Sequence, residues 1–431
     1  MTFTDNQTEA LAGASVAVSR SVLAHRDYRL FLGARLLSTL AVQIQSVAVG
    51  WQIYAISNDP LSLGVVGLAQ FLPMLALTLP AGDIADRFNR RSILTISCLL
   101  GAAVAAGFLL LTFFKVEALW PYYLVLALFG VVRTLSGPAG QSLVPILVPE
   151  AHISRAIAWA SSAFQTATIV GPAFGGALYI LGPEAAYAAC FILSIVAGAQ
   201  YWMIRTRMTP RSAAYAGKAL QRVVAGIHYV RARPIILGAI SLDLFAVLLG
   251  GATALLPVYA RDILQVGTIG LGILRTAPAV GAAVTGLVLG QWSLKRRAGP
   301  WMFACVAVFG IATIVFGISQ NFIVSLIALV VLGASDMVSV FVRSTLIQMA
   351  TPDEMRGRVS AVSMLFVGAS NELGEFESGT TASWFGTVPS VIIGGVGTLV
   401  VVGLWMWLFP GLRRVDRLSD VKPAGEAQAQ V

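Results

Sequence analysis

The chain has 431 residues, of which 57% are hydrophobic and only 11% are charged, and its formal net charge is +9. A soluble domain carries about 25% charged residues, so this chain cannot cover a water-facing surface with polar groups. The composition excludes a soluble enzyme, a disordered chain and, despite the positive charge, a soluble nucleic-acid-binding protein. The isolated residues Cys98, Cys190 and Cys305 lack the spacing of a metal site, so we expect neither a metal nor a disulfide.

The hydrophobic runs predict an all-α integral membrane protein with twelve transmembrane helices in two halves of six. Residues 1–29 lack the apolar core of a signal peptide and are predicted to be a cytoplasmic N-terminal tail. A spanning helix needs about 20 apolar residues, and such runs lie at 30–54, 61–82, 92–114, 121–146, 155–180, 185–204, 234–259, 268–292, 300–318, 322–349, 358–385 and 388–410. The predicted divisions are therefore a first half (30–204), a basic cytoplasmic loop (205–233), a second half (234–410) and a C-terminal cytoplasmic tail (411–431).

The basic residues orient the predicted spans. Of the 29 Lys and Arg residues, 23 lie in the tails and in the gaps on one side, whereas only Lys115 and Arg261 lie on the other side. By the positive-inside rule both termini are cytoplasmic, and we expect a multi-pass protein of the bacterial inner membrane. The segment 219–229 is expected to form a short amphipathic helix on the membrane, and the basic face is expected to contact anionic lipids.

The two predicted halves repeat each other in the same orientation. Pro149-Glu150 followed by Arg155 has the spacing of Pro352-Asp353 followed by Arg358. The second spans of the two halves also align, with Gly67, Gln70 and Pro73 corresponding to Gly272, Arg275 and Pro278. In transporters built from such parallel repeats, the substrate path lies between the halves near the bilayer midplane.

The gap between the second and third spans contains a charged turn at residues 82–91. Its glycine, two aspartates and clustered arginines resemble the signature of the major facilitator superfamily, with Asn89 standing where that family usually has glycine. Asparagine tolerates a left-handed backbone, so we expect the turn to be kept. The resemblance implies a conformational latch between the halves, formed by Gly82, Asp83, Asp86, Arg87, Arg90 and Arg91. The equivalent gap at 290–297 lacks both acids, so the latch is expected only in the first half.

The fifth span contains a glycine-rich motif, Gly171-Pro172-Ala173-Phe174-Gly175-Gly176. Gly171 and Gly175 lie about one turn apart and permit close helix packing, while Pro172 removes a backbone amide. The motif resembles the G-P-x-x-G-G element of antiporters in the same superfamily, and an arginine such as Arg133 in the fourth span is frequent in its exporters. A simple packing seam is the alternative interpretation of the four residues Gly171, Pro172, Gly175 and Gly176.

Residues 371–379 in the eleventh span resemble the subgroup that includes the enterobactin exporter and the transmembrane secretion effectors. Residues 26–29 before the first span and 255–257 at the end of the seventh fit the same subgroup. The likeness extends over essentially the whole chain. It implies export but specifies no substrate.

Nine charged residues lie within the predicted spans, where each costs at least about 2.5 kcal/mol unless it is paired or hydrated. They are Arg35, Arg133, Asp243, Arg275, Asp336, Arg343, Glu372, Glu375 and Glu377. Arg133 and Asp336 lie at similar depth in corresponding spans, so they are expected to pair across the central cavity. Asp243 and Arg275 form a second expected pair, whereas Arg35 and Arg343 lie near the cytoplasmic edge and are expected to extend to the surface.

Glu372 and Glu375 are three residues apart and share one helical face. Two adjacent carboxylates favour a bound proton on one of them near neutral pH, as a proton-coupled exporter requires. The alternative is that these acids only neutralise arginines. We therefore assign Arg133, Asp243, Arg275, Asp336, Glu372 and Glu375 as candidates for proton coupling or substrate binding.

The sequence has no phosphate-binding loop, so an ion gradient is the expected energy source and no cofactor is expected. We predict a secondary active transporter, not an enzyme, that exports a small amphipathic molecule such as a siderophore, drug or hydrophobic metabolite in exchange for protons. It is expected to act as a monomer. An uptake permease of the same fold and a non-transporting sensor or assembly protein remain as alternatives.

Overall fold

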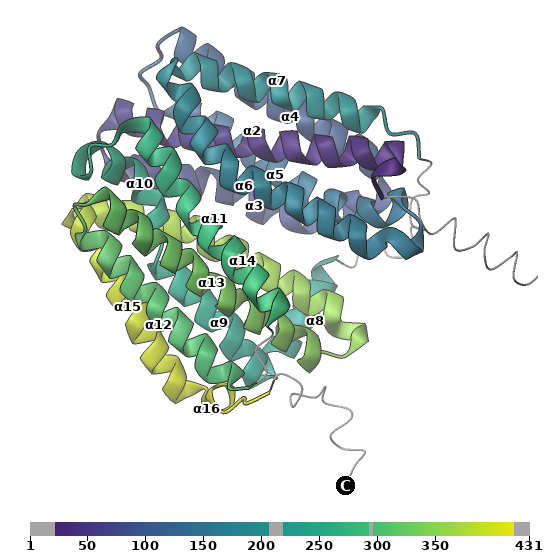
Figure 1. Ribbon diagram of the computed structural model, residues 1–431, viewed down its shortest axis with the longest axis vertical. Coiled ribbons are helices and arrows are strands. Elements are labelled where there is room, and N and C mark those ends of the chain that lie inside the picture. Colours follow the sequence, from purple (N-terminus) through teal and green to yellow (C-terminus); the bar gives the residue numbers. More distant parts are fainter. Residues whose placement is uncertain (1–21, 207–218, 293–295, 418–431) are drawn as a thin grey trace, which may run out of the picture.

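The structure is a computed structural model that describes residues 22–206, 219–292 and 296–417, and these are helical apart from short connections (Figure 1). The side chains of residues 79, 82, 83, 85–87, 219, 220 and 222 lie outside the description. The first half contains α2 (Arg26–Ser57), α3 (Pro60–Arg87), α4 (Arg90–Phe113), α5 (Trp120–Leu147), α6 (Ile153–Ile180) and α7 (Pro183–Trp202). The second half contains α9 (Pro234–Leu249), α11 (Gly267–Gln291), α12 (Ala298–Ile318), α13 (Phe322–Ala350), α14 (Asp353–Phe385) and α15 (Thr387–Leu408). The short elements are η1 (Val22–Ala24), η2 (Glu150–His152), α8 (Ala219–Arg231), η4 (Ala252–Leu255), α10 (Leu256–Val258), η5 (Tyr259–Ile263) and α16 (Pro410–Arg413).

Ten helices of the described chain are long and apolar enough to cross a membrane. The long helices α6 and α14, which correspond to the predicted fifth and eleventh spans, are not among these ten because their sequences are less apolar. They contain 28 and 33 residues. At about 1.5 Å per residue, both are long enough to cross a hydrocarbon layer of about 30 Å.

Short capping motifs set several helix boundaries. At the end of α2, Asn58 adopts a left-handed conformation with φ of 50°, and Asp59 then caps α3 by accepting the amide of Leu61 at 3.0 Å. The left-handed backbone considered for Asn89 is wrong. Asn89 has φ of −63° and its side chain instead accepts the amide of Arg91 at 3.0 Å, so it starts α4 as an N-cap.

The predicted seventh span is interrupted. Helix α9 ends at Leu249, where the chain turns at Gly250 and Gly251. A Cβ atom at Gly250 would lie 2.5 Å from the Phe309 ring, and one at Gly251 would lie 2.7 Å from the carbonyl oxygen of Gly374, so only glycine fits at either position. The chain continues through η4 and α10 into η5, which is a π-helix. Such wide turns occur frequently at functional sites.

The two halves pack their helices in the same pairs. In the first half, α2 lies against α6 and α7, α4 against α5 and α7, and α3 against α5. In the second half, the helices at the same positions in the order pack likewise: α9 against α14 and α15, α12 against α13 and α15, and α11 against α13.

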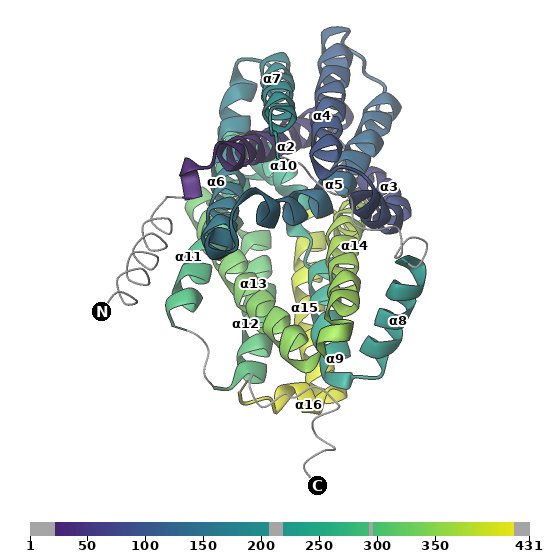
Figure 2. The same ribbon diagram turned by 90° about the vertical axis from the view of Figure 1, so that its right-hand side faces the viewer.

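Two helix pairs join the halves, α3 with α14 and α6 with α11 (Figures 1 and 2). Each joins the second helix of one half to the fifth helix of the other.

We call the end where α2 begins and α15 finishes the tail end, and the end containing Ser57 and Gly267 the far end. The short helix α8, in the connection between the halves, packs against α14 and α9, and it forms where an amphipathic helix was predicted.

Candidate functional site

An ion pair joins the two halves at the α3–α14 contact. Nη1 of Arg133, on α5, donates to Oε1 of Glu372, on α14, at 2.9 Å. The same nitrogen donates to Oε1 of Gln70, on α3, at 3.0 Å. The side chain of Glu372 is 7% exposed, whereas that of Arg133 is 47% exposed. The guanidinium therefore covers a buried carboxylate on one side and remains accessible on the other.

Glu375 lies one turn further along the same helix and faces α3. A Cβ atom at Gly67 would lie 2.8 Å from the Cβ of Glu375 and 2.8 Å from the carbonyl oxygen of Glu372. A Cβ at Gly64 would likewise lie 3.2 Å from the Cα of Gly379. Small residues in α3 thus let α14 approach closely enough to bring both carboxylates to the contact between the halves.

Arg275 adds a second cation to this region. Its Nη2 donates to Oγ of Ser46, on α2, at 2.6 Å, and its Nη1 donates to the carbonyl oxygen of Ser46 at 3.4 Å. Arg275 interacts electrostatically with Glu375, Glu372 and Arg133. We call these four charged residues the interface cluster, and its two cations balance its two anions.

Both pairings expected from depth along the spans are wrong. Arg133 binds Glu372 and not Asp336, because α14 lies between α5 and the second half and presents a nearer carboxylate. Arg275 binds Ser46, and Asp243 instead pairs with Nη1 of Arg343. Arg343 was expected to reach the surface, but it is only 5% exposed. Depth alone does not determine the direction in which a side chain leaves its helix.

Part of the predicted latch can be described. Gly82, Asp83, Asp86 and Arg87 end α3, but their side chains lie outside the described residues, so their role as a latch stays a prediction. Arg90 begins α4, and Nη1 of Arg91 donates to the carbonyl oxygen of Ile204 at 2.6 Å. Arg91 therefore joins α4 to the end of α7 within the first half.

In the equivalent connection of the second half, between α11 and α12, the carboxylate of Asp416 from the C-terminal segment binds Arg296 and Arg297. The backbone amide of Arg297 donates to Oδ1 of Asp416 at 3.0 Å, and Nε of Arg296 donates to Oδ2 at 3.3 Å. The hydrogen bond from the Arg297 amide and the nearby guanidinium of Arg296 lower the pKa of Asp416. Sequence reasoning missed this contact because Asp416 lies more than a hundred residues further along the chain.

The glycine motif of α6 packs against two helices. A Cβ atom at Gly171 would lie 2.5 Å from the Cβ of Gln43 on α2, and a Cβ atom at Gly175 would lie 3.1 Å from the Cα of Ile44 on the same helix. A Cβ at Gly176 would collide with the carbonyl oxygen of Thr268 on α11, in the other half.

Pro172 also faces α11, because a Cβ atom at Gly272 would lie 2.5 Å from the Pro172 carbonyl oxygen. Hydrogen bonds continue the α6–α11 contact. The Thr276 hydroxyl donates to the carbonyl oxygen of Ile169 at 2.9 Å, and Nε2 of Gln165 donates to that of Ala279 at 3.2 Å. The motif therefore brings the two halves into backbone contact, whatever further role it has.

A polar contact at the far end was missed by sequence reasoning. The hydroxyl of Tyr54, at the end of α2, donates to Oδ2 of Asp262 on η5. Nη1 of Arg261 donates to the carbonyl oxygen of Tyr54 at 3.3 Å, and its guanidinium lies 5.5 Å from the centre of the Tyr54 ring. In the sequence, Arg261 was informative only as one of the two basic residues on the non-cytoplasmic side. No sequence pattern indicated the π-helix on which it lies.

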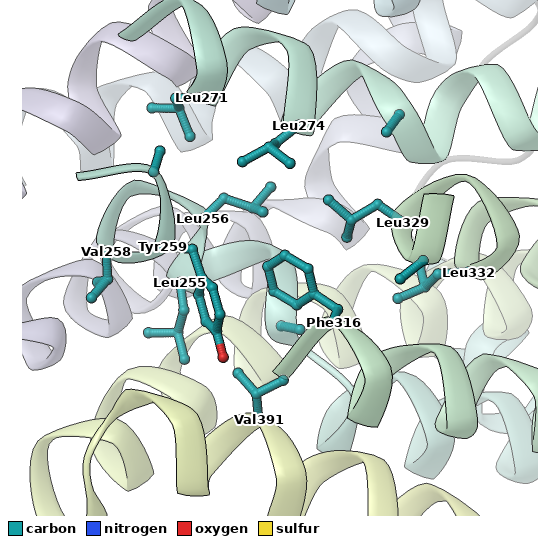
Figure 3. Close-up of a cluster of buried hydrophobic side chains, with 14 of the residues drawn as sticks. Leu255, Leu256, Val258, Tyr259, Leu271, Leu274, Phe316, Leu329, Leu332 and Val391 are labelled. Atoms are coloured by element: carbon teal, nitrogen blue, oxygen red, sulfur yellow. The ribbon is translucent and has the colours of Figure 1, made fainter. Parts of the chain in front are cut away.

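Buried hydrophobic residues surround this contact. Figure 3 shows Leu255, Leu256, Val258, Tyr259 and Phe316 within one cluster of buried side chains, in which the Tyr259 ring lies beside Phe316. Val47, Tyr54 and Leu63 of the first half belong to the same buried cluster. The halves are thus closed against each other at the far end by apolar packing as well as by hydrogen bonds.

This chain is similar in sequence to known membrane transporters. The family described as transmembrane secretion effector matches residues 18–427. The enterobactin exporter EntS of Salmonella paratyphi A is 26% identical over 417 residues, covering 93% of this chain and 96% of that protein. The enterobactin exporter EntS of Escherichia coli is 24% identical over 418 residues, with 94% and 96% covered.

Solved transporter structures share the fold at low sequence identity. A bacterial homologue of the human lysosomal transporter Spinster, in an inward-facing and occupied conformation, has a TM-score of 0.70 and 15% identity over 89% of this chain and 97% of that one. The nucleoside transporter NupG has a TM-score of 0.68 and 14% identity, with 88% and 100% covered.

Proposed function

Because the chain belongs to the family of transmembrane secretion effectors, which are transporters of the major facilitator type, we propose that it exports a small amphipathic molecule in exchange for protons. A siderophore, a drug and a hydrophobic metabolite are the cargo classes that we propose. The interface cluster of Arg133, Arg275, Glu372 and Glu375 is the observation that carries this proposal. Charges placed between two halves, and not inside one, can change partners when the halves move.

The contacts between the halves support an alternating-access mechanism. The closest approaches between backbones involve Gly64 and Gly67 on α3 and Pro172 and Gly176 on α6, and these four residues lie toward the far end. Contacts nearer the middle of the helices, such as Met74 with Gly368, involve side chains. If both termini are cytoplasmic, as the basic residues indicate, this arrangement corresponds to closure on the outside and access from the cytoplasm. Cargo would then reach the exposed face of Arg133 from inside the cell.

The matching helix pairs support twelve spans arranged as two parallel six-helix repeats. Under this proposal α6 and α14 complete the ten apolar spans. Their polar residues face the other half and a central path, which explains why both helices are less apolar than their neighbours. We propose the bacterial inner membrane as the location and a monomer as the working unit.

The proposal is tested in everted inner-membrane vesicles, which acidify their lumen by respiration. Vesicles containing the chain should accumulate enterobactin or ethidium, chosen as a siderophore and a drug-like probe, and a protonophore should abolish the accumulation. Vesicles without the chain are the control. Accumulation that continues unchanged after the proton gradient has collapsed would rule out proton antiport.

A first mutational prediction concerns closure at the far end. Tyr54→Phe removes the hydroxyl that binds Asp262, so the outward-open state should become more populated. A hydrogen bond at this partly exposed position is worth about 1 kcal/mol, which corresponds to about fivefold. In a chain otherwise free of cysteine, a cysteine replacing the buried Ala382 should react about fivefold faster with a membrane-impermeant maleimide added from the far-end side.

The matched control is Tyr123→Phe, because the Tyr123 hydroxyl donates at 3.4 Å to the carbonyl oxygen of Ser62 within the first half. Its labelling rate should not change. Equal labelling in Tyr54→Phe and in the parent chain would remove the Tyr54–Asp262 contact from the mechanism.

We further propose that anionic phospholipid occupies a groove beside α8. The groove has a volume of about 680 Å³, and Val224, Ala225, His228 and Arg233 contribute to its lining. Apolar side chains suit an acyl chain, and Arg233 suits a phosphate. Arg233→Gln should reduce the thermal stabilisation given by phosphatidylglycerol in nanodiscs, whereas Arg413→Gln should not. Equal stabilisation of the two variants would contradict this site.

A further inference from the structure

A second group of charged residues lies inside the second half, away from the interface cluster. Asp243 on α9 and Arg343 on α13 form an ion pair whose side chains are only 6% and 7% exposed. Asp336 lies seven residues before Arg343, two turns along the same face of α13. The second half therefore contains two carboxylates and one guanidinium in this region, and only Asp243 is paired with the guanidinium.

Asp336 has no hydrogen-bond or ion-pair partner among the side chains that the structure describes. It lines a cavity of about 10 Å³ together with Asp243, and Val306 and Phe309 of α12 close one side. This volume holds about one water molecule. Ser335 and Ser339 also line the cavity and are 7% and 3% exposed.

Neither serine hydroxyl has a hydrogen-bond partner within the described chain. Hydroxyls in so apolar a lining are stabilised when a polar molecule in the cavity binds them. A water molecule in the cavity would lie among two hydroxyls and two carboxylates, because Ser335, Ser339, Asp243 and Asp336 all line it. The cavity is therefore built to hold a polar occupant.

The charge balance identifies what binds with that water. With both aspartates ionised and Arg343 protonated, the site carries one uncompensated negative charge, which an apolar environment disfavours by at least about 2.5 kcal/mol. The cavity lining from α12 is apolar, and Arg275, Glu372 and Glu375, on the neighbouring helices α11 and α14, are not part of it. One added proton makes the site neutral.

We propose that Asp336, with the water-sized cavity between it and Asp243, is the proton-binding site that drives export, separate from the interface cluster that binds cargo. This inference rests on the proposed function. Asp243 holds Arg343 in place, so the proton binds at Asp336. Helix α13 packs along α11, and α11 meets α6 of the first half at Gly176, so the charge state of Asp336 acts on a helix that joins the halves.

The test uses the full chain in proteoliposomes with enterobactin or ethidium, whichever the parent chain transports. A gradient of one pH unit is worth about 1.4 kcal/mol, so exchange of one proton per cargo molecule gives about tenfold accumulation. Asp336→Asn should still let the probe move down its own concentration gradient. Its ratio of inside to outside probe concentration should not exceed about 1. Asp336→Glu should restore accumulation, which separates a proton-binding role from a role in folding.

The control is Glu377→Gln, which removes another acid of the second half that does not line the cavity, and it should keep about tenfold accumulation. Full proton-driven accumulation by Asp336→Asn would overturn the site, and so would accumulation by the parent chain that follows a sodium gradient instead of pH. If the parent chain accumulates neither probe under any gradient, the proposed function itself fails. That result is distinguishable from failure of the proton site alone, in which the parent chain and Asp336→Asn would both show proton-driven accumulation.

Discussion

Arg133→Gln is expected to abolish efflux while leaving the chain inserted in the membrane. The substitution leaves the buried carboxylate of Glu372 without its cation. Removing one partner of a buried, hydrogen-bonded charge pair costs about 2–5 kcal/mol, and because Arg133 is 47% exposed we expect about 2 kcal/mol here. At about 1.4 kcal/mol per tenfold change, transport should fall at least about 30-fold. Accumulation of enterobactin or ethidium in everted vesicles measures the loss, and the monodisperse fraction after detergent extraction measures folding.

The double variant Arg133→Gln/Glu372→Gln distinguishes pairing from transport. It removes both charges, so stability should recover relative to Arg133→Gln, but efflux should not recover, because the interface no longer carries charges that can exchange partners. Arg155→Gln, which removes an exposed arginine of the tail end, is the matched control and should transport normally. Full efflux by the double variant would restrict the pair to a structural role.

Gly176→Ala is expected to produce the second large effect. The added methyl group would collide with the carbonyl oxygen of Thr268 and lie 3.0 Å from its carbonyl carbon, so the backbones of α6 and α11 must separate. Overpacking of this kind costs about 1–3 kcal/mol. We expect a lower melting temperature in detergent and a loss of efflux, because this contact joins the halves.

Gly403→Ala is the matched control, since a Cβ atom at Gly403 of α15 would have no neighbour within 4 Å. It should leave both melting temperature and efflux unchanged. Gly272→Ala acts on the same contact from α11, where its Cβ would meet the Pro172 carbonyl oxygen. The effects of Gly176→Ala and Gly272→Ala should therefore be less than additive. Normal transport by Gly176→Ala would show that this contact is not needed.

The two proposals assign cargo binding and proton binding to separate groups of charged residues. The interface cluster contacts both halves and is partly exposed through Arg133, so it suits a cargo that must be released when the halves move. The group around Asp336 lies within the second half, away from the contact between the halves, so under the proposal proton binding and cargo binding use different residues. Coupling then requires only that protonation of Asp336 changes how α13 and α11 pack.

The composition and the hydrophobic runs determined the protein class and most of the helices. In a bilayer only helices and closed barrels satisfy the backbone, and the apolar runs are continuous and do not alternate as barrel strands do, so they predict membrane-crossing helices. The sequence also located the charged residues within the spans, because residue type and depth can be read from the hydrophobic runs, and their assignment as transport residues stays a prediction.

Their partners were decided only by the tertiary structure. Whether Arg133 meets Asp336 or Glu372 depends on which helix lies between the halves, and that follows from close approaches at Gly64, Gly67 and Gly379 and not from any local pattern. The Tyr54–Asp262 contact likewise requires the break at Gly250 and the π-helix that follows it.

The composition of 11% charged residues therefore established that this chain belongs in a membrane and where charge would matter. Which charges neutralise one another was fixed by helix packing, because a side chain's partner depends on its direction around the helix and on the identity of the neighbouring helix. Those two quantities are set by contacts between residues far apart in the chain, such as Arg133 and Glu372, and no local sequence pattern contains them.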